Sequence, residues 1–276
     1  MLIVSMSTIP SRFDMIAPAL NSLLAQSAKI DRIILYIPHK YRRFKDYDGT
    51  LPEVPEGVEI RRATKDYGPA TKIFCAVQEF ADQDCDILFC DDDRVYARNW
   101  AQTLLDARAM KPDACIATMG REASTLFDSK QIRTHHPRVV KREWQKDYWF
   151  LLRYAFWYMI RRLPSRPDRP RRKVFKTAGY IDILMGFGGA LVKPSFFEPE
   201  DFDIPEGCWT VDDIWISGML ARKGIGIWIP ANVNEPANTN AYLSDPLWAS
   251  TIEEIGRVGA EDITFEYLQK TYGIWP

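Results

Sequence analysis

Three consecutive carboxylates follow an apolar run in the stretch DILFCDDDRVYARNW, residues 86–100, at Asp91, Asp92 and Asp93. Like charges held this close raise one another's pKa unless a cation relieves the repulsion. A divalent metal ion would relieve it, since Mn²⁺ and Mg²⁺ are bound by carboxylate oxygens. The alternative is a solvated acidic turn that caps the following helix. The triplet therefore predicts a metal site, provided that its strand context holds it at a ligand-binding position.

A second acidic pair, Asp212 and Asp213, lies in the stretch WTVDDIW at the predicted start of a helix. The helix dipole stabilises negative charge there and keeps a carboxylate ionised, as a general base requires. The alternative is a plain N-cap, in which an Asp side chain only satisfies backbone N–H groups. The pair is our candidate for proton abstraction.

The elements that must position these carboxylates alternate between strand and helix patterns. Apolar runs predict strands over residues 2–7, 31–38, 58–63, 86–90, 114–119 and 225–230, with further strands around the glycines of 180–197. Helical spacing predicts helices over residues 12–27, 70–81, 99–110 and 211–224. This alternation predicts an α/β fold, a mostly parallel sheet flanked by helices. Ligands bind outside the carboxyl ends of such strands, which is where the triplet would emerge.

Bulk composition is that of an ordinary globular protein of 276 residues, 46% of them hydrophobic, with a formal net charge of −1. No overall field favours nucleic acid, so an anionic partner would need a local basic patch. The five cysteines form no CxxC pair, which favours reduced thiols in a cytoplasmic protein. The N-terminus MLIVSMSTIP lacks a basic n-region and predicts a first strand rather than a signal peptide.

The order of these motifs resembles a known family. The chain has β-α-β units, then an apolar strand that leads into a D-x-D triplet, then a Gly-rich stretch, and then a helix that begins with paired acids. This order resembles the nucleotide-sugar-dependent glycosyltransferases of GT-A (Rossmann-like) fold. The opening STIPSRFDMIAPALNSLLAQSAKIDRIILYI is similar to the start of family 2 glycosyltransferases. The stretch VDDIWISGMLARKGI is similar to the acidic-pair helix of family 2 and of β-1,3-galactosyltransferase-like enzymes. The resemblance covers most of the chain except an insertion at about residues 120–176.

The resemblance implies a metal-dependent transfer of a sugar from a nucleoside-diphosphate-sugar, UDP being the first expectation, to a hydroxyl of a glycan or lipid-linked saccharide. Mn²⁺ or Mg²⁺ would assist departure of the diphosphate. Asp93 would bind the metal, Asp91 would bind the metal or the ribose hydroxyls, and Asp92 would contribute to the donor site. Asp213 would be the base of an inverting reaction, and Asp212 would support it.

Further donor contacts are expected from KDYGPATK, residues 65–72, where Asp66, Gly68 and Lys72 precede or begin a helix. An ordinary turn with Pro69 at the first helical position is an equal alternative. Arg12, after the first strand, is expected at the donor for the same positional reason. YIPHKYRR stands where family 2 has an acidic turn that holds the nucleotide base, so the base stays open.

The chain divides in this interpretation into a nucleotide-sugar-binding half (1–119), the insertion (120–176) and an acceptor and catalytic half with a C-terminal tail (177–276). The insertion contains WQKDYWFLLRYAFWYMIRRLPSRPDRPRRK, an aromatic run followed by arginines. Residues 148–173 could lie on the inner face of a membrane and meet a lipid-linked acceptor. The alternative is a helix packed on the core or on a second subunit.

Two other functions remain open. DDDRV also fits the D-x-D-x-(T/V) motif of haloacid-dehalogenase-like, Mg²⁺-dependent phosphatases, although that motif normally follows the first strand of its domain. A non-catalytic GT-A-like binding protein is the third possibility.

Overall fold

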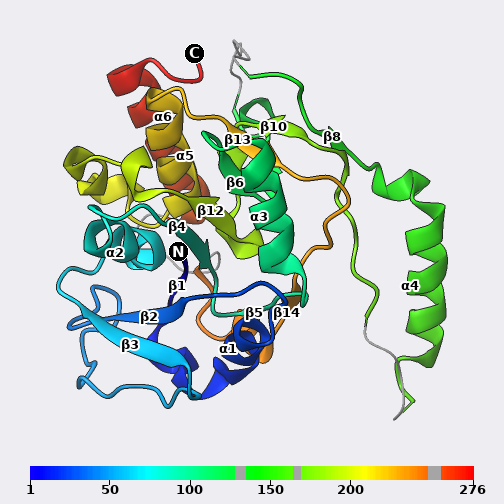
Figure 1. Cartoon of the computed structure of the whole chain (residues 1–276), viewed down its shortest axis with the longest axis horizontal. Helices are drawn as coiled ribbons and strands as arrows, with labels where there is room; N and C mark the ends of the chain where they lie inside the picture. The colour runs from blue at the N-terminus through cyan, green and yellow to red at the C-terminus, as the bar shows by residue number, and fades with distance from the viewer. Residues whose placement is uncertain (128–134, 164–168, 248–255) are drawn as a thin grey trace.

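An eight-stranded, mostly parallel sheet forms the centre of the computed structural model, which describes residues 1–127, 135–163, 169–247 and 256–276 (Figure 1). In spatial order its strands are β10 (Gly179–Ile181), β13 (Ile227–Ile229), β6 (Cys115–Ala117), β12 (Ala190–Val192), β4 (Asp86–Cys90), β1 (Leu2–Ser7), β2 (Arg32–Pro38) and β3 (Val58–Ala63). β1 pairs in parallel with β2 and β4, whereas β12 runs antiparallel between β4 and β6, and β10 antiparallel to β13. The predicted α/β class is confirmed.

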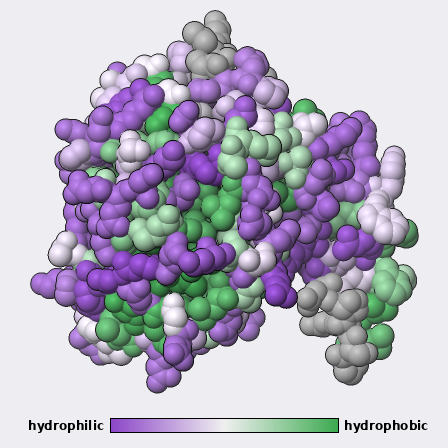
Figure 2. Space-filling model, viewed as in Figure 1, coloured by the Kyte–Doolittle hydropathy of each residue, from purple (hydrophilic) through white to green (hydrophobic). Residues whose placement is uncertain are grey.

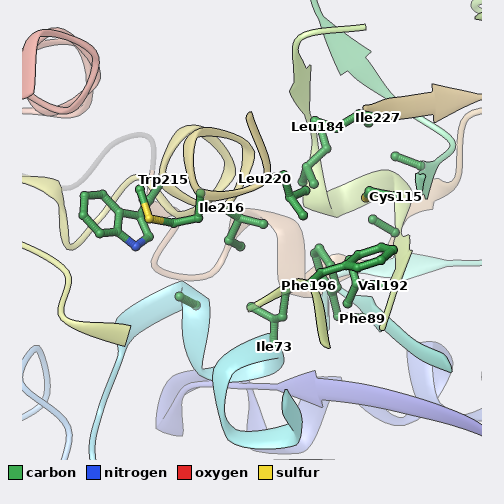
Figure 3. Packing of buried hydrophobic residues seen from close by; sticks show 14 of the residues in the cluster. Ile73, Phe89, Cys115, Leu184, Val192, Phe196, Trp215, Ile216, Leu220 and Ile227 are labelled. Carbon is green, nitrogen blue, oxygen red and sulfur yellow. The ribbon is translucent and has the colours of Figure 1, made fainter. Parts of the chain in front are cut away.

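Helices cover both faces of this sheet, which explains why its strands are continuous apolar runs. The helices of the chain are α1 (Ala17–Leu24), α2 (Thr71–Glu79), α3 (Trp100–Met110), α4 (Tyr148–Ile160), α5 (Asp212–Arg222) and α6 (Arg257–Tyr272). On β1, Ile3 packs in a core with α2, α5 and α6, while Val4 packs in a second core with α1 and α3. Figure 3 shows part of the first core, where Ile73 of α2 lies near Phe89 of β4, while Trp215 of α5 lies farther from the strands.

Three short antiparallel pairs lie outside the main sheet. They are β11 (Ile183–Leu184) with β7 (Gly120–Arg121), β14 (Ala237–Asn238) with β5 (Arg94–Val95), and β8 (Val140–Lys141) with β9 (Phe175–Thr177). Among the described residues of 120–176, none belongs to the eight-stranded sheet, whereas residues 1–119 and 177–276 both contribute strands to it.

The insertion holds α4 away from the sheet and its covering helices (Figure 1). None of the residues of α4 is buried, so the alternative of a helix packed on the core is wrong. Part of the aromatic and basic run, including Arg166, lies outside the described residues. Of the helices in the described ranges, none is long and apolar enough to cross a membrane.

The boundaries differ from the predicted ones at one informative place. A helix was expected over residues 12–27, but a 3-10 helix, Pro10–Met15, comes first and α1 begins only at Ala17. Pro18 explains the late start, because proline lacks an N–H and its ring clashes with a preceding helical turn. The break leaves Arg12 in this 3-10 helix, shortly after the end of β1.

Candidate functional site

The cavity that the predicted residues line lies where the strand order of the sheet reverses. β2 and β3 follow β1 on one side, and β4 lies on its other side, so the carboxyl ends of β1 and β4 form a topological switch point. Open α/β sheets bind ligands at such points. A cavity of about 380 Å³ opens there. It is lined by all nine residues predicted from the sequence: Arg12, Asp66, Gly68, Lys72, Asp91, Asp92, Asp93, Asp212 and Asp213.

The acidic triplet is buried at this edge. Asp92 and Asp93 are only 5% and 8% exposed, and α3 begins much later with Asn99 as its N-cap, so a solvated capping turn is excluded. Asp92 accepts from Thr8 Oγ1 at 2.5 Å and from Arg12 Nη1 at 2.6 Å. Burial raises the pKa of Asp92, although Arg12 opposes the shift. Asp92 therefore ties the end of β4 to the loop after β1.

Asp93 is the least compensated of the three carboxylates. Its Oδ2 is 3.5 Å from Arg12 Nη1, and its Oδ1 is 3.0 Å from Arg94 Nε but accepts no hydrogen bond. Burial first, and then the charges of Asp91 and Asp92, raise the pKa of Asp93 to about 6. Bringing another cation close would favour the ionised form.

Lys72 joins the two acidic motifs. Its Nζ lies 2.5 Å from Asp91 Oδ1 and 2.9 Å from Asp212 Oδ2, and its side chain is 6% exposed. Burial would lower the pKa of Lys72, but Asp212 and Asp91 outweigh it and hold the pKa well above its usual value. Burial likewise works to raise the pKa of Asp91, but Lys72 overcomes it, so the net shift is downward. The ammonium thus favours the charged form of Asp91 in a low-dielectric site and lies between the two acids.

Asp213 has a different environment from Asp212. Its Oδ1 accepts from the backbone N–H of Gly186 at 2.8 Å, and its side chain lines the cavity beside that glycine. A Cβ on Gly186 would lie 2.9 Å from Lys72 Nζ and 3.0 Å from Asp213 Oδ1, so only glycine fits there without displacing the charged groups. The N-cap of α5 is Val211, which rules out the plain N-cap interpretation of the pair.

The KDYGPATK turn packs against the segment that leads into α5. Asp66 accepts from the N–H groups of Arg42 and Gly68, at 2.7 and 2.8 Å, and so anchors both the YIPHKYRR turn and its own turn. Gly68 has a φ of +60°, and a Cβ there would lie 2.8 Å from the ring of Trp209. The expected Pro69 start is also present, in a 3-10 helix, Gly68–Ala70, that leads into α2. Both interpretations of this stretch are therefore compatible with the structure.

The carboxylates fit a divalent cation only if a ligand supplies most of its coordination. Among the described residues, no three His, Cys, Asp or Glu side chains converge as a metal cluster. Asp91 and Asp93 both line the cavity, and Asp93 has a buried oxygen without a hydrogen bond. One or two carboxylates plus substrate phosphates is the usual Mg²⁺ arrangement in nucleotide sites. The donor set is thus suited to a metal bound together with a diphosphate.

Several cavity residues were not predicted from the sequence. Arg94, next to the triplet, stacks on Phe187 and on Tyr242, with its guanidinium carbon 4.6 and 4.9 Å from the ring centroids. Tyr242 reaches the cavity because the N–H of Thr239 donates to the carbonyl of Asp93 at 2.8 Å. Arg94 could have been suspected from its place beside the carboxylates, whereas no local pattern marks Tyr242.

No protein-family model matches this chain, and no curated protein sequence matches it. The resemblance in the motifs therefore remains a prediction.

Proposed function

We propose that this chain is a metal-dependent glycosyltransferase that moves a sugar from a nucleoside-diphosphate-sugar to a hydroxyl acceptor with inversion. The observation that carries the proposal is the bridge made by Lys72, which holds Asp91 of the triplet and Asp212 of the acidic pair at one cavity. The transfer needs a cation at the departing diphosphate and a proton acceptor at the same place. The triplet, at the end of β4, would hold the cation, and the pair, at the start of α5, would supply the proton acceptor.

The donor would lie at the switch point, with its diphosphate near the triplet. Arg12 and Lys72 offer positive charge there, from the 3-10 helix after β1 and from the start of α2. Asp91 and Asp93 are the residues that would hold Mn²⁺ or Mg²⁺, which when bound would stabilise charge on the departing diphosphate. Asp66 lines the same cavity, on the side towards Tyr41 and Phe44, where a base has aromatic surface to contact.

The acceptor hydroxyl would lie near Asp213. The carboxylate is held by the N–H of Gly186 in the first turn of α5, where the helix dipole favours its ionised form. It would remove the proton as the hydroxyl attacks the anomeric carbon. Asp212, whose carboxylate lies against Lys72, would keep that ammonium in place rather than take the proton.

The position of the triplet favours this proposal over a haloacid-dehalogenase-like phosphatase. In that superfamily the D-x-D motif normally follows the first strand, whereas Asp91 follows β4, after three other strands of the sheet. The late acids of those phosphatases usually follow a strand, whereas Asp212 begins α5.

Turnover of a panel of nucleoside-diphosphate-sugars with Mn²⁺, followed by release of the nucleoside diphosphate, tests the proposal. We expect release from at least one donor in the wild type and at least a hundredfold less from Asp213→Asn, the approximate scale for a lost general base. Binding of a nucleoside diphosphate without any release would favour a non-catalytic binding protein. Mg²⁺-dependent hydrolysis of a phosphomonoester, with no donor turnover, would favour the phosphatase.

A further inference from the structure

The insertion presents an apolar helix face that nothing in the described chain covers. α4 has the sequence YWFLLRYAFWYMI, with Arg153 as its one charged residue. At about 1.5 Å per residue, its 13 residues span about 20 Å. A helix that is apolar around most of its circumference is normally buried, so one standing clear of the body needs a partner.

One side of α4 faces outward. Trp149, Leu152, Phe156 and Met159, which we call the outer face, follow one another at helical spacing and are 68%, 62%, 55% and 74% exposed. The other side is partly covered, because the guanidinium of Arg169 stacks on Tyr154 with its carbon 5.3 Å from the ring centroid. Figure 2 shows apolar and near-neutral surface on this helix beside hydrophilic surface.

The charge around the outer face identifies the kind of partner. Residues 141–176 contain twelve Lys or Arg and three Asp or Glu, a formal charge of +9 in a chain whose net charge is −1. Arg161 and Arg162 directly follow the last turn of α4. Apolar and aromatic side chains flanked by cations match the interface of an anionic lipid bilayer. The lipid tails bury the apolar side chains, and the anionic headgroups attract the cations.

Two described arginines later in the insertion contact backbone close to the cavity. Arg171 Nη1 donates to the carbonyl of Val95 at 3.5 Å, and the carbonyl of Arg172 accepts from the N–H of Glu235 at 2.9 Å. Val95 follows Arg94, which lines the cavity. A surface that engages the insertion would therefore be connected to the rim of the site through these two arginines.

We propose that the outer face of α4, together with Arg161 and Arg162, forms a docking surface for anionic membrane. α4 lies in the interface with its outer face in the lipid, and Arg161 and Arg162 contact the headgroups. Nothing in this proposal requires the chain to transfer sugars, so the two proposals are tested separately.

Vesicle co-sedimentation tests the docking surface, with vesicles of phosphatidylcholine alone and of phosphatidylcholine mixed with phosphatidylserine. The wild type should sediment with the mixed vesicles, more weakly as salt screens the charges, and much less with the neutral ones. Arg161→Gln with Arg162→Gln should lower partition by about twenty-five-fold, from roughly a fivefold loss for each charge. Lys29→Gln with Lys45→Gln removes the same charge from exposed positions elsewhere and should leave partition nearly unchanged.

The apolar contribution has its own variant pair. Trp149→Ser with Met159→Ser should lower partition by about tenfold or more, because both side chains lose burial in lipid. Met110→Ser with Val258→Ser, which are 65% and 74% exposed on other helices, is the matched control and should bind as the wild type does. α4 contributes no buried residue, so both variants should keep the wild-type circular dichroism and melting temperature.

Two results would overturn the proposal. One is wild-type protein that stays in the supernatant with mixed vesicles at low salt. The other is a wild-type protein that binds no vesicles and is a dimer in sedimentation equilibrium, while Trp149→Ser with Met159→Ser is a monomer. That result would assign the outer face to a second copy of the chain. Metal-dependent nucleotide binding would be unaffected by either result.

Discussion

Replacing Lys72 by methionine tests the bridge on which the site is built. The ammonium lies between Asp91 and Asp212 with 6% of its side chain exposed, and Asp212 is as buried as its partner. Methionine fills much of the same space but removes the charge, which leaves buried carboxylates uncompensated. Breaking a buried ion pair from one side destabilises proteins by about 3–5 kcal/mol. We expect a loss of that size in the free energy of unfolding of Lys72→Met at pH 7.

The assay is urea unfolding followed by circular dichroism, with Lys65→Met as the matched control. Lys65 pairs with Asp203 at 3.6 Å, but their side chains are 56% and 83% exposed, so its replacement should change stability by less than about 1 kcal/mol. The double variant Lys72→Met with Asp212→Asn should recover part of the loss, because one of the stranded charges is gone.

The pH dependence of the loss follows from the sign of the shifts. Lys72 lowers the pKa of Asp91, so the pair contributes stability above the unfolded pKa of an aspartate, about 3.9, and loses it as the pH falls through the folded value. The difference between wild type and Lys72→Met should therefore be largest near neutral pH and shrink in acid. A loss no larger than that of Lys65→Met at pH 7 would refute the reasoning.

Three further predictions concern single positions. Burial and Asp91 raise the pKa of Asp93 to about 6, so ionisation of Asp93 destabilises the metal-free fold as the pH rises from about 4 to 6. The variant Asp93→Asn cannot ionise there. In urea unfolding at pH 7 with a chelator present, it should be up to about 3 kcal/mol more stable than the wild type. Asp213→Asn should bind nucleoside diphosphate with near wild-type affinity in calorimetry, since the base acts on the acceptor. Gly68→Ala should lower stability by about 2–4 kcal/mol, because its Cβ meets a ring and its φ is positive, whereas Gly224→Ala, also at positive φ but in open space, should lose only about 1 kcal/mol.

The sheet and the place of the triplet were predictable because both depend on local pattern. Continuous apolar runs such as Asp86–Cys90 occur where a strand is covered on both faces, and a parallel strand directs the residues after it to one known edge. Helix α5 was predictable from its apolar spacing and from Gly224, which ends it at a φ of +69°. The C-terminal helix α6 was missed, although Ala260, Thr264 and Leu268 are buried at helical spacing.

The ion pairs inside the site were not predictable, because they join residues far apart in sequence. Lys72 was placed near a diphosphate from its position at a helix start, yet its contact with Asp212 depends on how α2 and α5 pack on one face of the sheet. The same holds for Arg94 and Tyr242, which meet only because the segment at Thr239 returns to Asp93. No spacing rule reports such contacts.

The most direct test of the proposed function is calorimetric titration of the wild type with a panel of nucleoside diphosphates, UDP first, with and without Mn²⁺. If Asp91 and Asp93 hold a metal together with the diphosphate, at least one nucleotide should bind much more tightly when Mn²⁺ is present, and Asp93→Asn should abolish the gain. Equal affinity with and without Mn²⁺ for every nucleotide that binds, or an undiminished gain in Asp93→Asn, would contradict the proposal.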